Sequence, residues 1–307
     1  MDRLEIEEAP SISNRLEFPH YTIKLGDLSV QWFHQVSQVT IASYGFLAGN
    51  MDVLSRIRGA WGAELKESAS PQALDRKPCP WNPPCALDIF FREQLRLGKH
   101  GIAKPFTLST ENVRGNLVVS LAVFGFACDW MPVADHALKA ALRNKVPWAR
   151  LARNIFLPEF VVSDAAMLSF EGMPAVDETD QISIEFLTPM DASGFDPIDN
   201  PATVIGRLAR RVDNLARWQD SKIDINWVHQ SRKWKQLDYD VSGLIRTDFN
   251  RNSSAQKTRF TMGLVTGELC VEGNLSTLLP LLMIGQSCHV GKAAVNGFGR
   301  FKIKAVM

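Results

Sequence analysis

One stretch near the end of the chain, residues 289–303, most constrains what this sequence can fold into. It reads His-Val-Gly-Lys-Ala-Ala-Val-Asn-Gly-Phe-Gly-Arg-Phe-Lys-Ile and combines three glycines with three cations and a histidine. An apolar run, residues 275–284, precedes it, and residues 298–306 then alternate as in a half-buried strand. A helix, a glycine-rich loop and a final strand are therefore expected in that order.

Glycine suits such a loop because it reaches positive φ and has no Cβ. Backbone N–H groups can then approach a phosphate, to which Lys292, Arg300 and Lys302 supply charge. Two common phosphate loops do not fit: residues 285–293 are one residue too long for a P-loop and lack its hydroxyl, and residues 297–299 precede a strand instead of a helix. The pattern predicts a loop that grips a nucleic-acid backbone, with a tight structural turn as the alternative.

Together with segments upstream, this stretch resembles the C-terminal signature of the RAMP superfamily of CRISPR-associated proteins. It is most similar to the branch that processes precursor CRISPR RNA. Residues 184–189 resemble that branch's strand entering the second domain, residues 207–215 its arginine-containing helix, and residues 263–269 the strand before its last helix. The resemblance implies two tandem ferredoxin-like (RRM-like) domains of order βαββαβ, with a glycine-rich loop before the last strand.

Hydrophobic periodicity predicts the same α+β order twice along the chain. In the first unit, assigned to residues 1–175, strands and helices are expected at 18–25, 52–67, 106–108, 116–130, 132–144 and 154–169. In the second unit, assigned to residues 176–307, they are expected at 182–187, 201–218, 239–249, 259–271, 275–284 and 298–306. Residues 29–43 fit helix and strand equally, and residues 86–97 are expected to form a further helix.

The helix expected at residues 52–67 contains two glycines beside two arginines, Arg56 and Arg58. A glycine inside a helix costs about 1 kcal/mol relative to alanine, so something is expected to pack closely against this backbone. The family that the chain resembles has a similar Arg-Gly-x-x-Gly stretch in its first helix, close to where RNA is cut. Ordinary helix packing with both arginines solvated is the alternative.

Metal-free RNA cleavage by the neighbouring 2′-hydroxyl needs a base, an acid and cations for the charge of the transition state. Histidine is the natural base near neutral pH, and His34 lies before the first helix, where the resemblance implies a catalytic histidine. In an arginine-centred alternative, Arg56, Arg58 and Arg300 orient the 2′-hydroxyl and neutralise the phosphate. No paired-carboxylate motif stands near the basic stretches, so neither a metal ion nor another cofactor is expected.

Residues 227–235 mix tryptophans with cations, a combination used to recognise RNA loops. An amphipathic insert with its tryptophans in the core is the alternative. The residues expected to contact RNA are His289, Gly291, Lys292, Gly297, Gly299, Lys302, Arg207, Arg210, Arg211, Arg232, Lys233 and Lys235.

The overall charge balance argues against a protein whose whole surface binds polyanions. Net charge is +1, from 34 Lys and Arg against 33 Asp and Glu, which still permits a local basic cleft. The five cysteines form no disulfide pattern, and the acidic N-terminus lacks the features of a signal peptide. The longest apolar run, residues 116–130, is too short to span a membrane. A cytoplasmic protein without a membrane partner is expected.

These features together predict a metal-independent endoribonuclease that binds the CRISPR repeat hairpin and cleaves precursor CRISPR RNA. The mature guide RNA is expected to stay bound, in an effector complex with other CRISPR subunits. A non-catalytic subunit that only holds guide RNA is the alternative. The two differ in whether His34, Arg56 and Arg58 lie close to the glycine-rich loop.

Overall fold

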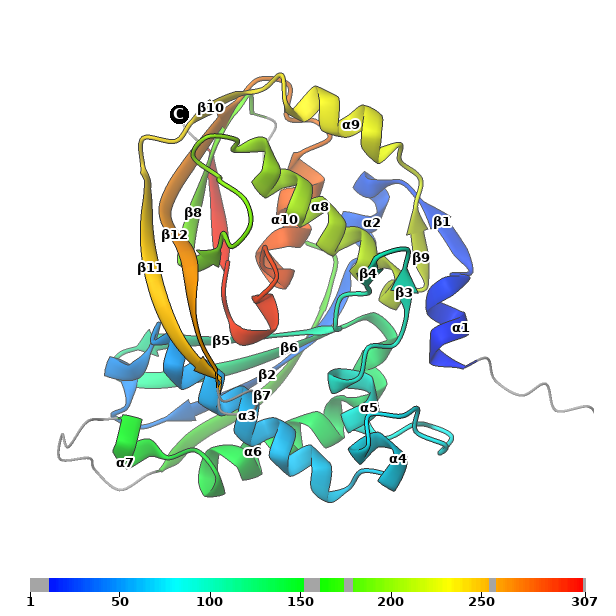
Figure 1. Ribbon diagram of the computed structural model, residues 1–307, viewed down its shortest axis with the longest axis vertical. Coiled ribbons are helices and arrows are strands. Elements are labelled where there is room, and N and C mark those ends of the chain that lie inside the picture. Colours follow the sequence, from blue (N-terminus) through cyan, green and yellow to red (C-terminus); the bar gives the residue numbers. More distant parts are fainter. Residues whose placement is uncertain (1–10, 152–160, 174–178, 254–257, 306–307) are drawn as a thin grey trace, which may run out of the picture.

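Two antiparallel sheets, each covered on one face by two long helices, form the body of the protein in the computed structural model (Figure 1). The structure describes residues 11–151, 161–173, 179–253 and 258–305. No helix within those ranges is both long and apolar enough to cross a membrane.

The first sheet follows the order predicted from the sequence. Its elements are β2 (Phe33–Ile41), α3 (Met51–Glu67), β5 (Phe106–Val113), β6 (Asn116–Phe124), α6 (Met131–Asn144) and β7 (Val162–Glu171). The strands lie in the order β5-β6-β2-β7, and all neighbours are antiparallel. Residues 152–160, where the last strand was expected to begin, lie outside the described ranges.

The second sheet repeats this arrangement. Its elements are β8 (Gln181–Asp191), α8 (Ala202–Ala216), β11 (Leu244–Ser253), β12 (Thr258–Glu272), α10 (Leu279–Cys288) and β13 (Phe301–Ala305). The strand order is β11-β12-β8-β13, and β10 (Asp238–Asp240) pairs with the far end of β12. The tandem ferredoxin-like fold is therefore confirmed, while the boundary placed between residues 175 and 176 falls outside the described residues.

The apolar face predicted for α3 is buried. Val53, Ile57, Trp61 and Leu65 are each at most 1% exposed, as expected for residues three or four positions apart on one side of a helix. The helix begins one residue earlier than expected, because the side chain of Asn50 accepts the N–H of Asp52 at 2.9 Å and caps the end.

The alternation of β2 decides which of its side chains face the helices. Ser37 donates a hydrogen bond of 2.6 Å to Asp135 of α6, and Val39 and Ile41 are fully buried on the same side. Successive side chains of a strand point to opposite faces. His34 therefore points to the face of the sheet that α3 and α6 do not cover.

The residues before the first sheet pack against the second unit. They form α1 (Ile12–Glu17), β1 (Tyr21–Ile23) and α2 (Leu25–Gln31). β1 pairs in parallel with β9 (Ser221–Ile223), so the expectation that residues 18–25 open the first sheet is wrong. A three-residue strand whose partner lies 200 residues later leaves no periodic pattern in the sequence. The undecided segment 29–43 divides between the end of α2 and β2.

Several shorter elements connect these layers: α4 (Pro71–Leu74), α5 (Ala86–Phe91), β3 (Arg96–Leu97), β4 (His100–Gly101), α7 (Trp148–Leu151) and α9 (Trp227–Trp234). The helix expected over residues 86–97 ends at Phe91, and β3 and β4 then form a small hairpin. The strand expected over residues 116–130 ends at Phe124, and a 3₁₀ helix follows it.

The edge strand β5 of the first sheet makes direct contacts with the second unit. Thr107 Oγ1 donates to the carbonyl oxygen of Ser287 at 3.4 Å. The 3₁₀ turn Ala294–Asn296 of the glycine-rich loop lies over β5 and α3, and Arg300 forms an ion pair with Glu111 of β5. The loop singled out in the sequence thus sits where the two units meet (Figure 1).

Candidate nucleic-acid interface

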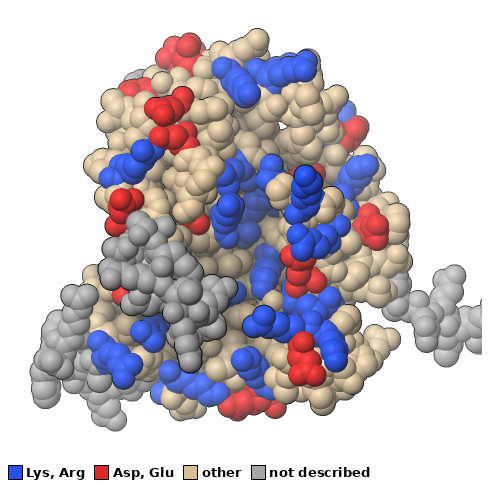
Figure 2. All heavy atoms as spheres, in the orientation of Figure 1, with Lys and Arg blue, Asp and Glu red and all other residues tan. Residues whose placement is uncertain are grey.

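A cleft of about 570 Å³ opens between α8, the β4–β5 connection and the start of the glycine-rich loop. Figure 2 shows lysine and arginine side chains gathered around a hollow in the middle of this face of the molecule. Among the described residues that line it, all the side chains that can carry charge are basic. We call this hollow the basic cleft; it is lined by His100, Gly101, Ile102, Ala103, Lys104, Arg207, Arg210, Arg211, Asn214, Gly291, Lys292 and Val295.

The amphipathic pattern of α8 turns two predicted arginines toward the cleft. The apolar positions Val204, Leu208, Val212 and Leu215 are buried, so the opposite side of the helix is left for Arg207 and Arg210. The guanidinium of Arg207 lies 3.8 Å from the ring centroid of Phe195, a cation–π contact that restricts its position. Both arginines therefore present charge at the cleft wall from a rigid element.

Lys104 is a cleft residue that the sequence did not reveal. Its ammonium donates to the carbonyl oxygen of Phe91 at 2.5 Å and lies 5.5 Å from the Phe91 ring centroid. Burial, together with the charge of Arg58, lowers the pKa of Lys104 to about 8. The lowered pKa depends on Arg58 of α3 and Phe91 of α5, which lie beside Lys104 in the fold. No local sequence motif predicts this arrangement.

The first-helix arginines take different places. Arg58 lies 5.0 Å from the Phe91 ring centroid, on the same ring as Lys104, and one helical turn after Leu54, which packs against Gly297. Arg56 is exposed on α3 and does not line the basic cleft. α3 thus contacts the glycine-rich loop through Leu54, and its Arg58 lies on the same ring as the cleft residue Lys104.

The two glycines of α3 have separate explanations. A Cβ at Gly62 would lie 2.8 Å from Cζ of Phe91, so the ring needs this glycine and the ordinary packing alternative holds there. A Cβ at Gly59 would meet nothing within 4 Å. Only Gly59 leaves the backbone open to a ligand.

His34 does not lie in the cleft. It is 7% exposed and its ring stacks on Phe170 with centroids 4.9 Å apart, on the face of the first sheet opposite α3. Burial lowers the pKa of His34 to about 4. The alternation of β2 thus places His34 on the face of the first sheet away from Arg58, and its role as catalytic base stays a prediction. His100, on the β3–β4 hairpin, is the histidine that lines the cleft.

Two glycines of the loop serve the fold. Gly297 and Gly299 have φ of 82° and 68°, and side chains there would collide with Leu54 and with the carbonyl oxygen of Val290. The N–H of Gly299 donates to Pro189 at 2.9 Å. The tight-turn alternative therefore accounts for these two glycines, and their contact with RNA stays a prediction. Gly291, with φ of 94°, lines the cleft.

Two further predicted contacts are buried at the end of α10. Arg211 is 8% exposed; its Nε donates to the carbonyl oxygen of Cys288 at 2.5 Å and its Nη2 to Phe106 at 3.3 Å. It thereby satisfies a terminal carbonyl of the helix. His289 is 3% exposed, and burial with the charges of Arg300 and Arg211 holds its pKa well below the usual range. Both side chains are buried in the fold, and their contact with RNA stays a prediction.

The remaining predicted cations lie away from the cleft. Lys302 pairs with Glu185 at 3.2 Å on the outer face of the second sheet, because its neighbour Phe301 points inward to α10. On α9 and just after it, Trp234 is buried, as the amphipathic-insert alternative expects, and the cations are exposed: Arg232, Lys233 and Lys235.

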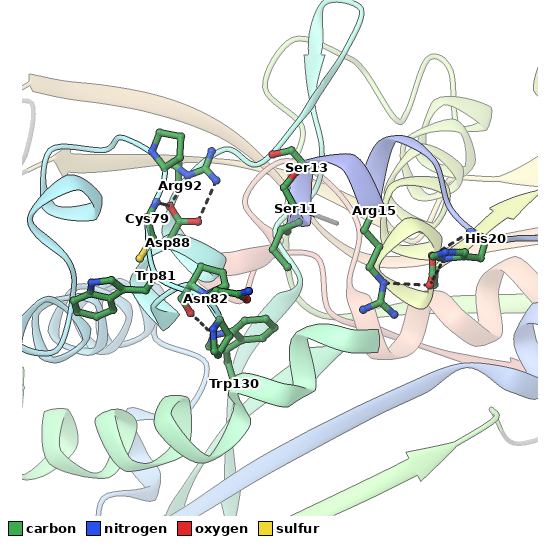
Figure 3. A pocket seen from close by; sticks show the side chains of 15 residues that line it. Ser11, Ser13, Arg15, His20, Cys79, Trp81, Asn82, Asp88, Arg92 and Trp130 are labelled. Atoms are coloured by element: carbon green, nitrogen blue, oxygen red, sulfur yellow. Dashed lines mark hydrogen bonds and ion pairs between the residues drawn. The ribbon is translucent and has the colours of Figure 1, made fainter. Parts of the chain in front are cut away.

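A larger cavity, of about 790 Å³, lies between α1 and residues 78–84. Arg15 pairs with the Asp220 carboxylate at 3.1 Å and His20 with the same carboxylate at 2.8 Å. Figure 3 shows the side chains of Arg15 and His20 directed at one common group. On the other side of the cavity Arg92 pairs with Asp88. Because carboxylates hold these cations, this cavity offers less free positive charge for phosphates than the basic cleft.

A cluster of three or more histidine, cysteine, aspartate or glutamate side chains able to hold a metal ion does not occur among the described residues. Cys79 and Cys85 are free thiols that belong to no such cluster in that part of the chain.

Comparisons with known proteins agree with this geometry. The family model of the CRISPR-associated endoribonuclease Cas6 matches residues 184–301. The product complex of Cas6 (TTHB231) from Thermus thermophilus is 15% identical over 89% of this chain and 99% of that chain, with a TM-score of 0.51. The product complex of Cas6 (TTHA0078) is 14% identical over 89% and 100%, with a TM-score of 0.53. No curated protein matches the sequence. The resemblance to the RNA-processing RAMP branch is confirmed for residues 184–301, and the two structures confirm the fold.

Proposed function

We propose, from the Cas6 match of residues 184–301, that this protein is an endoribonuclease that binds the CRISPR repeat hairpin and cleaves precursor CRISPR RNA. The observation that carries the proposal is the basic cleft beside the glycine-rich loop, with Arg58 of α3 on the ring that the cleft residue Lys104 also contacts. The two Cas6 structures of the same fold were solved as product complexes, which fits a protein of this kind.

The cleft residues divide between holding the RNA and acting at the cut. Arg207, Arg210 and Lys292 bind backbone phosphates, and Gly291 lets the chain approach them without a Cβ. Arg58 and Lys104, which share the Phe91 ring, neutralise the charge that develops on the phosphorane. No metal ion is needed if these side chains supply the positive charge.

Proton transfer falls to His100 and Lys104, two of the titratable side chains that line the cleft. One removes the proton of the 2′-hydroxyl, and the other protonates the leaving 5′-oxygen. Lys104 suits the second role because its pKa of about 8 lets it give up a proton near neutral pH. Arg56 and Arg300 keep their roles in the arginine-centred version of the mechanism.

The product guide RNA stays in the cleft, and the protein then belongs to an effector complex with other CRISPR subunits. A subunit that only holds guide RNA is the competing function, and one observation favours it: His34 lies outside the cleft. Cleavage itself separates the two.

The test is incubation with the host's own repeat RNA, with and without chelator, followed by analysis of the product ends. We expect a 2′,3′-cyclic phosphate in both conditions and no cleavage when the nucleotide 5′ of the cut is deoxy. His100→Gln should slow cleavage about 10²-fold or more, whereas the matched control His34→Gln should leave the cleavage rate per folded molecule unchanged. Loss of cleavage in chelator would refute the metal-free chemistry, and tight binding without cleavage would favour the guide-holding subunit.

A further inference from the structure

A second cavity lies on the far side of the two cleft arginines. It has a volume of about 540 Å³ and is enclosed by α8, α9 and the loop that carries Phe195. Arg207 and Arg210 line both this cavity and the basic cleft, so the two share a wall of positive charge. Whatever occupies the second cavity therefore lies next to the groups that bind phosphate.

The other walls combine aromatic surface with hydrogen-bonding groups. Phe195 and Trp227 are half-buried, and Trp227 lies 6.1 Å from the buried ring of Trp234. Asp213 holds the indole N–H of Trp227 on one carboxylate oxygen at 3.2 Å, and Ser231 lines the same side. The second carboxylate oxygen of Asp213 can accept a hydrogen bond from an N–H group of a ligand. A flat aromatic molecule that carries N–H donors fits these walls.

Gly206 lies on the α8 wall of this cavity and has no packing role. A Cβ at this position would meet nothing within 4 Å. Glycine is the poorest helix former after proline, so a glycine inside α8 weakens the helix. In contrast to Gly62 and Gly285, where aromatic rings occupy the place of a side chain, Gly206 keeps space free.

We propose that this cavity binds one unpaired nucleobase of the RNA whose backbone lies in the basic cleft. The base stacks against the aromatic wall beside Trp227, as bases stack in single-strand binding sites. Asp213 accepts an N–H from an exocyclic amino group of the base, a donor that uracil lacks, so an amino-bearing base is favoured over uracil. The proposal rests on the proposed RNA-processing function and adds to it a nucleotide that must be extruded from the hairpin.

The test measures binding of the full-length protein to repeat RNA in which each unpaired nucleotide is made abasic in turn. Wild-type protein should lose about 5- to 150-fold in affinity at one position, the range expected for one stacked base. Gly206→Leu fills the cavity and strengthens the helix. It should lose the same factor on intact RNA and no longer distinguish intact from abasic RNA.

Gly206→Ala is the matched control, because one methyl group leaves most of the cavity open; it should bind as the wild type does. Asp213→Asn, which keeps an acceptor for Trp227, should reduce the preference for an amino-bearing base over uracil. The pocket is refuted if wild-type protein is indifferent to every abasic position, or if Gly206→Leu still responds to the same position. Failure of wild-type protein to bind repeat RNA at all would overturn both proposals, whereas normal cleavage without an abasic effect would overturn this one alone.

Discussion

Replacement of Lys104 by methionine should make the free protein more stable and its RNA complex weaker. The side chain of Lys104 is packed against Phe91 and repelled by Arg58, and its pKa falls from 10.5 to about 8. Since one pKa unit corresponds to 1.36 kcal/mol, holding the proton at pH 7 costs the folded protein about 3 kcal/mol. The variant also loses the hydrogen bond to the Phe91 carbonyl, which lowers its free energy of unfolding by about 1 kcal/mol. The net expectation for Lys104→Met is a gain of about 2 kcal/mol.

How stability depends on pH follows from which state, folded or unfolded, binds the Lys104 proton more tightly. The unfolded chain keeps the Lys104 proton up to about pH 10.5, whereas the folded protein releases it above about pH 8. Between those values the unfolded state binds more protons, so wild-type stability rises with pH relative to that of the variant. The advantage of Lys104→Met should therefore be constant below pH 8 and shrink above it.

Urea unfolding at pH 7, 8.5 and 9.5 measures this difference, and Lys99→Met, at an exposed lysine nearby, is the matched control with little expected effect. Lys104→Met should at the same time bind repeat RNA more weakly. In the complex a phosphate beside the Lys104 ammonium stabilises its positive charge, and methionine cannot make this interaction. A variant that is less stable at pH 7, or an advantage that does not change with pH, would refute the reasoning.

Three other substitutions test separate parts of the interface. Arg58→Ala should slow RNA cleavage about 10²–10³-fold with a much smaller loss of binding, whereas Arg56→Ala, outside the cleft, should slow it less; equal rate losses would contradict this assignment. Gly299→Val should lower the melting temperature by many degrees, because it combines positive φ with a collision, and an unchanged melting curve would show that the turn is not needed. Arg211→Ala should cost about 1–3 kcal/mol in urea unfolding by leaving the buried carbonyl of Cys288 unsatisfied, and an unchanged salt dependence of RNA binding should accompany it.

Much of the fold was predictable because periodicity reports which face of an element is buried. The same rule applied more strictly would have placed Arg211 inside: it lies three residues after Leu208 and four before Leu215, both of which are buried. His34 was misplaced for a similar reason, since the sequence does not say which face of a strand the helices cover. The hydrogen bond from Ser37 to Asp135 shows that Ser37 faces the helices. His34, three positions earlier on the same strand, must then face the other side.

The rest of the site could not be predicted, because it depends on contacts between distant segments. Lys104 has an altered pKa only because α5 places the Phe91 carbonyl and ring beside it. His100 reaches the cleft on the β3–β4 hairpin, and the first strand of that hairpin lies where the sequence predicted the end of a helix. The glycine-rich loop was recognised as important, yet its two functions, closing a turn and lining a cleft, lie at different glycines of one motif.

The pairing of β1 with β9 has a consequence for how the chain folds during synthesis. Tyr21 pairs with Ser221, and Arg15 with Asp220, so residues 11–31 complete these contacts only after the whole first sheet has been made. At translation rates of about 5–20 residues per second, that delay is about 10–40 s. The first sheet, whose strands all lie between residues 33 and 171, can fold within this interval. The pairing of β1 with β9 is therefore added to a first sheet that can already be folded, and it ties together segments 200 residues apart.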